Sequence, residues 1–111
     1  MFDAKYEPLF IEEKTVKEIE KFWVYFREEE ERLVDALIKK DRVFMDEFER
    51  KLTNVFFRNK KPIRFRFERK EGVIHFTFFF GHSSYLLTVA NALFERKETK
   101  LKYRWSFDLE K

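Results

Sequence analysis

The sequence predicts an α+β domain in which helices pack on one face of a three-stranded sheet. Apolar residues recur at helical spacing through the first half of the chain, and in the second half they alternate with polar residues at period two. Sixteen phenylalanines, two tryptophans and four tyrosines supply a large apolar volume, and only two glycines and two prolines interrupt the chain. A chain of 111 residues can bury one core without metal or disulfide support. We therefore expect a single domain over residues 1–111.

The first half predicts an N-terminal arm over residues 1–14, followed by a helical pair over residues 15–56. Thr15, with Glu18 three residues later, matches the capping box that opens a helix. The pattern leaves open whether this helix continues unbroken to Lys39 or bends near its four consecutive glutamates. Four apolar residues of the arm are expected to pin it to the core: Tyr6, Leu9, Phe10 and Ile11.

A second helix is expected from Asp41, a residue type that caps helix N-termini well. Its apolar side chains lie at i, i+4, i+8 and i+11, so they form one stripe. Pro62 and the polar residues before it end the helix. The stripe comprises Phe44, Phe48, Leu52 and Val55.

Period-two alternation begins at Ile63 and predicts a hairpin that closes at Gly72, a residue able to adopt positive φ. The second strand runs from residue 73 to 80, and Ser83 or Ser84 caps a third helix. A last strand is expected over residues 101–109, where apolar and polar residues alternate cleanly.

These elements give the order ααββαβ, with a ββαβ sheet unit over residues 63–109. A third strand beside the first would make a fully antiparallel sheet in spatial order 2-1-3, and one beside the second would make a mixed sheet. We expect the antiparallel 2-1-3 order, with the helices on one face, because short sheets with one apolar face are typically antiparallel.

Composition excludes several classes of protein. The absence of cysteine rules out disulfides, thiol catalysis and cysteine-ligated zinc. No stretch is apolar over the ~18 residues that a membrane span requires, and the first residues lack the pattern of a signal peptide. We therefore expect a cytoplasmic protein without a membrane partner.

The net charge of +3 is unevenly distributed along the chain. Residues 1–56 carry a net charge of −4 and residues 57–111 carry +7, which together give that total. A basic C-terminal half suits an anionic partner, whereas neutralisation of one half by the other in the fold is the simpler alternative.

No catalytic, metal or cofactor motif is present. His75 and His82 lack the spacing of converging metal ligands, and the glutamates at 28–31 are expected to form a solvated helical face. Ser83 has no nucleophile-elbow setting. Two glycines are too few for a phosphate-binding loop. We therefore predict no catalytic residue, no metal and no cofactor.

One resemblance lies in the aromatic helix and the last strand. The run Phe22-Trp23-Val24-Tyr25-Phe26, Glu30 and the late pair Arg104-Trp105 resemble an uncharacterised family of small bacterial α+β proteins. Its members carry a Phe-Trp-x-Trp-Phe-x-x-Asn-Glu helix, a Phe-rich hairpin, a further helix and an Arg-Trp strand. The resemblance covers about residues 16–107, with Tyr25 in place of the second Trp and Glu29 in place of the Asn. That family has no assigned activity, so the resemblance implies a fold and a bacterial origin but no site.

The sheet face opposite the helices is the one candidate site. In the 2-1-3 order it is a contiguous basic surface with one aromatic side chain. An ordinary solvated face is the plainest reading, with Glu68 and Asp108 pairing with its arginines. As functions we rank a non-enzymatic module or accessory protein that binds another protein or a second copy first. A binder of single-stranded nucleic acid comes second, and an enzyme of unrecognised type comes third. The face comprises Arg64, Arg66, His75, Thr77, Phe79, Lys102 and Arg104.

Overall fold

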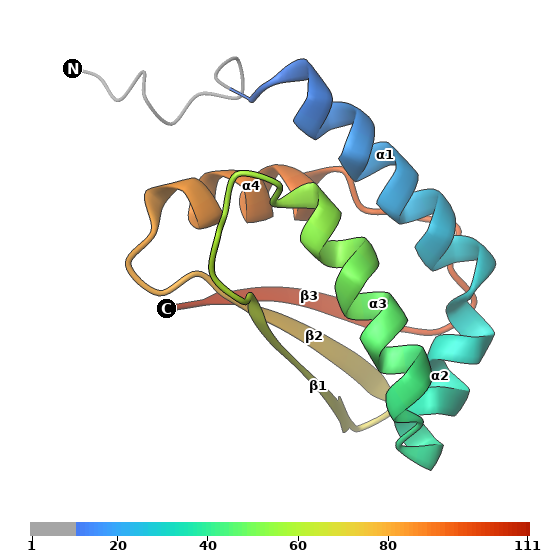
Figure 1. The fold of residues 1–111 in the computed structure, drawn as a ribbon. Coiled ribbons are helices and arrows are strands. Elements are labelled where there is room, and N and C mark those ends of the chain that lie inside the picture. Colours follow the sequence, from blue (N-terminus) through green and yellow to red (C-terminus); the bar gives the residue numbers. More distant parts are fainter. Residues whose placement is uncertain (1–10) are drawn as a thin grey trace.

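The computed structural model describes residues 11–111 as a helical layer packed on one face of a three-stranded sheet (Figure 1). The order is ααα followed by ββαβ, so the α+β class is confirmed. All four helices contribute side chains to one apolar core, which they share with the inner face of the sheet. The elements are α1 (Glu13–Glu28), α2 (Glu30–Lys39), α3 (Arg42–Val55), β1 (Arg64–Lys70), β2 (Val73–Phe79), α4 (Ser84–Glu95) and β3 (Trp105–Glu110).

The first predicted helix is two helices that meet at Glu29. Glu29 leaves the helical conformation at φ −107° and ψ 14°, so the chain bends within the acidic run. The predicted capping box is wrong, because α1 already begins at Glu13 and Thr15 lies inside it, buried. Of the predicted arm contacts, Ile11 packs against the core. The remainder of that prediction concerns residues 1–10, outside the described part of the chain.

Two predicted caps are present. The Asp41 carboxylate accepts a hydrogen bond from the Phe44 backbone N–H at 3.1 Å and opens α3. The Ser83 hydroxyl accepts one from the Leu86 N–H, also at 3.1 Å, and opens α4. The hairpin turn is only Glu71 and Gly72, both at positive φ, which is typical of two-residue hairpin loops.

The predicted sheet order is wrong. The strands lie in the order β1-β2-β3, with β1 antiparallel to β2 and β2 parallel to β3, so the sheet is mixed. The central position suits β2 because Ile74, Phe76 and Phe78 are buried on its inner face and Thr77 is buried on the other. A strand buried on both sides belongs in the middle of a sheet, whereas the alternating charges of β1 suit an edge.

The last strand is shorter than predicted, because it begins at Trp105 rather than at residue 101. The backbone N–H groups of Lys102 and Tyr103 donate to the Glu30 carboxylate, each at 2.8 Å, instead of joining a ladder. A side chain from α2 therefore determines where the strand starts.

Aromatic rings fill the space between the helices and the sheet. Phe48 of α3 is fully buried, and its ring centroid lies 5.5–6.4 Å from those of six other rings. The Trp23 indole N–H donates to the Leu93 carbonyl at 2.9 Å and so ties α1 to α4. Trp23, Phe26, Phe48 and Phe76 are buried in this core, and Phe65, Leu86 and Trp105 are partly buried against it.

No helix within residues 11–111 is long and apolar enough to cross a membrane.

Candidate functional site

The outer face of the sheet is the side opposite the helices (Figure 1). Within residues 11–111, all four helices lie on the other side. The pairing of the strands arranges its outward side chains in three rows, each crossing from β1 through β2 to β3. The rows are Arg64–Phe79–Glu110, Arg66–Thr77–Asp108 and Glu68–His75–Ser106.

Five of the seven predicted site residues lie together on this face. Arg64 and Arg66 are exposed on β1, and His75 and Phe79 are partly exposed on β2. Thr77 lies between them but is only 3% exposed, so it supports its neighbours rather than offering a contact surface.

The other two predicted residues, Lys102 and Arg104, precede β3 and do not extend a basic surface across the sheet. The Lys102 ammonium group bonds to the Glu31 carboxylate of α2, and this hydrogen bond and charge raise the pKa of the lysine. Arg104 is exposed, and its carbonyl accepts from the Ile74 N–H at 2.9 Å. The predicted contiguous basic surface is therefore wrong.

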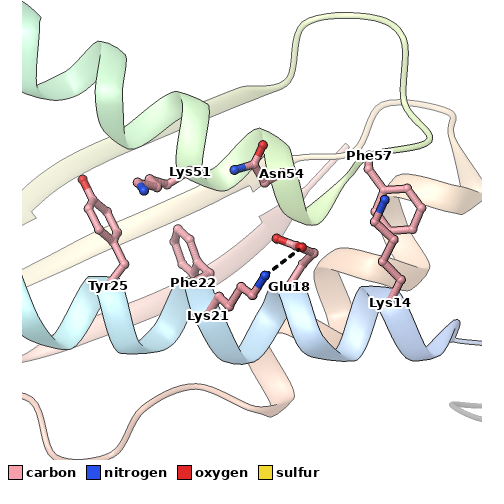
Figure 2. Close-up of a pocket in the computed structure, with 8 residues that line it drawn as sticks. All are labelled: Lys14, Glu18, Lys21, Phe22, Tyr25, Lys51, Asn54 and Phe57. Carbon is pink, nitrogen blue, oxygen red and sulfur yellow. Dashed lines mark ion pairs between the residues drawn. The ribbon is translucent and has the colours of Figure 1, made fainter.

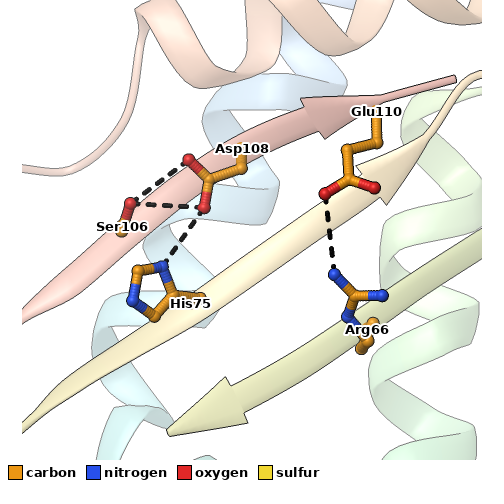
Figure 3. Close-up of polar contacts among 5 residues, drawn as sticks. All are labelled: Arg66, His75, Ser106, Asp108 and Glu110. Carbon is orange, nitrogen blue, oxygen red and sulfur yellow. Dashed lines mark hydrogen bonds and ion pairs between the residues drawn. The ribbon is translucent and has the colours of Figure 1, made fainter. Parts of the chain in front are cut away.

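Instead the outer face is polarised across the sheet, because β3 lies beside β2 rather than beside β1. Two arginines lie on the β1 side, and Asp108 and Glu110 lie on the β3 side. Arg66 reaches across β2 to Glu110 at 3.6 Å (Figure 3). Both side chains of that pair remain about half exposed, so their charges are accessible to a partner.

Phe79 of β2 is the aromatic side chain beside the two arginines of β1. The guanidinium groups of Arg64 and Arg66 each lie 5.2 Å from its ring centroid, within the range of cation–π attraction. A cavity of about 450 Å³ adjoins this cluster. Its lining residues are Glu49, Ile63, Arg64, Phe65, Arg66 and Phe79.

A serine, a histidine and an aspartate meet on the β3 side (Figure 3). The Asp108 carboxylate lies 3.4 Å from His75 Nδ1 and accepts from the Ser106 hydroxyl at 3.3 Å. A hydrolase triad requires the histidine between the other two, so that it takes the serine proton. Here the aspartate is central, and the arrangement is that of a polar surface network. It does supply the acidic partner that the sequence did not reveal for His75.

The environment of Glu30 differs from the one that the sequence predicts. Glu30 was assigned to a solvated face, yet it is 2% exposed. Its carboxylate accepts the Lys102 and Tyr103 backbone N–H groups and the Trp105 indole N–H, the last at 2.9 Å. This cluster lies on the helix side of the sheet, where the chain enters β3, and it positions that strand. The available signal was the late tryptophan, whose N–H needs an acceptor when buried.

A second surface hollow, of about 480 Å³, lies between α1 and α3 (Figure 2). Lys21 pairs with Glu18 at 3.6 Å, and the ammonium groups of Lys14 and Lys51 lie 4.4 and 5.5 Å from the ring centroids of Phe57 and Tyr25. Burial, followed by the charge of nearby Glu47, raises the Tyr25 pKa to about 12, so the phenol stays neutral. Each lysine here already contacts an acid or a ring, so the hollow needs no ligand to explain it.

Two further findings bear on function. Within the described part of the chain, no group of three or more histidine, cysteine, aspartate or glutamate residues could hold a metal ion. Comparison with protein families, curated proteins and solved structures finds no match to this chain.

Proposed function

We propose that this chain is a non-enzymatic protein-interaction module that binds its partner on the outer face of the sheet. The observation that carries the proposal is the Phe79 ring, flanked by the guanidinium groups of Arg64 and Arg66 on a face that no described helix covers. Aromatic and arginine side chains are enriched in protein interfaces and in their energetic centres.

The polarity of the face favours a protein over a nucleic acid. A single strand of nucleic acid carries a charge on every phosphate and needs a continuous cationic groove. Here Asp108 and Glu110 line the β3 side, and Lys102 is engaged by Glu31. A protein partner can instead present both signs of charge, so that it matches the arginines on the β1 side and the acids on the β3 side of the outer face.

Display of a random peptide library against the immobilised chain tests this proposal. We expect enrichment of peptides that combine carboxylates with an aromatic or aliphatic anchor. Arg66→Glu and Phe79→Ala should each weaken binding about tenfold or more, because tenfold corresponds to about 1.4 kcal/mol and central residues often exceed that. The matched control Lys97→Glu reverses an exposed charge in the loop after α4 and should leave binding unchanged.

A parallel titration with labelled poly-U oligomers separates the two ligand classes. Nucleic-acid binding would show log K falling with log salt by about 0.7 per phosphate contact. Tight, strongly salt-dependent oligomer binding that Arg66→Glu abolishes would replace the protein proposal with the nucleic-acid one. If the face engages neither peptides, nor oligomers, nor a second copy of the chain, it is an ordinary solvated face.

A further inference from the structure

We infer that the partner of the outer face is a second copy of this chain, docked face to face about a two-fold axis parallel to β2. This inference rests on the proposed function and names its partner. It follows from the order of charges across the three rows of the outer face, which differs between the two edges of the sheet.

A two-fold axis parallel to β2 brings β1 of one protomer over β3 of the other and keeps each row opposite itself. Arg64 then faces Glu110 of the partner subunit, and Arg66 faces Asp108 of the partner subunit. Each contact occurs twice, as an isologous interface requires. An in-plane axis perpendicular to the strands would instead place β1 over β1 and reverse the order of the rows. Through the middle row it would oppose Arg66 to Arg66 and Asp108 to Asp108 of the partner subunit, and only Arg64 would face an acid, Glu68. The charges therefore select one axis.

The same axis places the apolar part of the face on the axis itself. β2 lies over its own copy, so the partly exposed ring of Phe79, the last residue of β2, meets the partner's Phe79, with Arg64 and Glu110 on either side in the same row. Apolar contacts flanked by charged side chains are common in protein interfaces. Two sheets that pack face to face keep their strands within about 30° of each other, so these rows stay opposed near the centre.

The internal Arg66–Glu110 pair does not oppose this arrangement. It is long, at 3.6 Å, and both side chains are about half exposed, so each can accept a second partner. Doubling such pairs across a two-fold axis makes a network of alternating charges, which is more stabilising than isolated surface pairs. Three short strands offer less area than a standard interface, so we expect a dimer that dissociates at about micromolar concentrations.

Two charge-reversal variants test the inference by sedimentation equilibrium. Arg64→Glu with Arg66→Glu makes the face acidic throughout, and Asp108→Lys with Glu110→Lys makes it basic. We expect the unaltered chain to approach twice its 13.9 kDa mass as concentration rises. Each variant alone should stay monomeric because its own face repels itself. An equimolar mixture should dimerise again, because every contact across the axis is then between opposite charges.

The controls address folding and non-specific charge effects. Circular dichroism checks that both variants stay folded. Lys97→Glu with Lys100→Glu makes the same change in net charge as the acidic variant, at exposed loop positions, and should still dimerise. The chain has no cysteine, so Phe79→Cys provides a unique thiol. It should cross-link to its own copy on oxidation, whereas Arg64→Cys should not.

Two outcomes overturn the inference: an unaltered chain that stays monomeric up to about millimolar concentration, or a mixture of variants that fails to associate. The proposed function would survive the first outcome if the monomer selects peptides through Arg66 and Phe79. If the chain stays monomeric and also selects no peptides, both proposals are wrong. The two failures are therefore distinguishable.

Discussion

Replacing Glu30 with alanine should lower the free energy of unfolding by about 3 kcal/mol. The substitution removes the acceptor of three N–H groups, from Lys102, Tyr103 and Trp105. A buried donor left without a partner costs about 1–3 kcal/mol, and water admitted to the opened loop offsets part of the sum. Urea unfolding followed by circular dichroism measures the change.

The neighbouring glutamate provides the control. Glu31 forms an exposed ion pair with Lys102, and such surface pairs contribute little to stability. Glu31→Ala should therefore have little effect. A double-mutant cycle between Glu30→Ala and Trp105→Phe should give a coupling of about 1 kcal/mol or more, because they share a hydrogen bond. Equal effects of the two glutamate substitutions would contradict the described role of Glu30.

Phe48→Ala should be more damaging, with a loss of about 3–5 kcal/mol. The ring is 0% exposed and contacts rings from α1, β1 and β2, so its removal leaves a cavity in the middle of the core. A fold of this size is stable by about 5–15 kcal/mol in total, so the variant approaches the limit of folding.

Two comparisons make that result interpretable. Phe48→Leu keeps much of the volume and should recover more than half of the loss. Val43→Ala removes a side chain that is 82% exposed, on the same helix, and should change stability by no more than about 0.5 kcal/mol. A melting temperature of Phe48→Ala close to that of the unaltered chain would show that α3 does not lie over the sheet as described.

Local patterns predicted the local elements well, because helix periodicity, caps and turn chemistry are properties of adjacent residues. Asp41, Ser83 and Gly72 each have the predicted role. The predicted sheet order was wrong, because the order depends on which strand neighbours which across a long connection. One sequence signal was available. The near-continuous apolar run of β2 is typical of a central strand, whereas the alternating charges of β1 are typical of an edge.

The candidate site was predicted in part for the same reason. Strand alternation alone placed Arg64, Arg66 and Phe79 on one face. The acidic side of that face depends on the position of β3, so Asp108 and Glu110 were not recognised as a second half of the site. The prediction of a solvated Glu30 was wrong because its partners lie more than 70 residues away, and a run of four glutamates has the sequence appearance of a solvated helix.

The position of β3 has a consequence for how the chain folds. β1 and β2 are joined by a two-residue turn, whereas residues 80–104 separate β2 from β3. Closing the longer loop costs more chain entropy, so the hairpin should form first and β3 should dock late. Pulse-labelled hydrogen exchange during refolding should then protect β1 amides before β3 amides. Simultaneous protection would contradict this order.

Until β3 docks, β2 has an open edge beside the side chains of Phe76 and Phe78, and such an edge is a template for pairing with other chains. The Glu30 cluster then stabilises the docked position of β3, which covers this edge. A chain without the Glu30 carboxylate would leave the edge of β2 uncovered for longer. Its yield of native protein on refolding would therefore be limited by aggregation more than by its equilibrium stability.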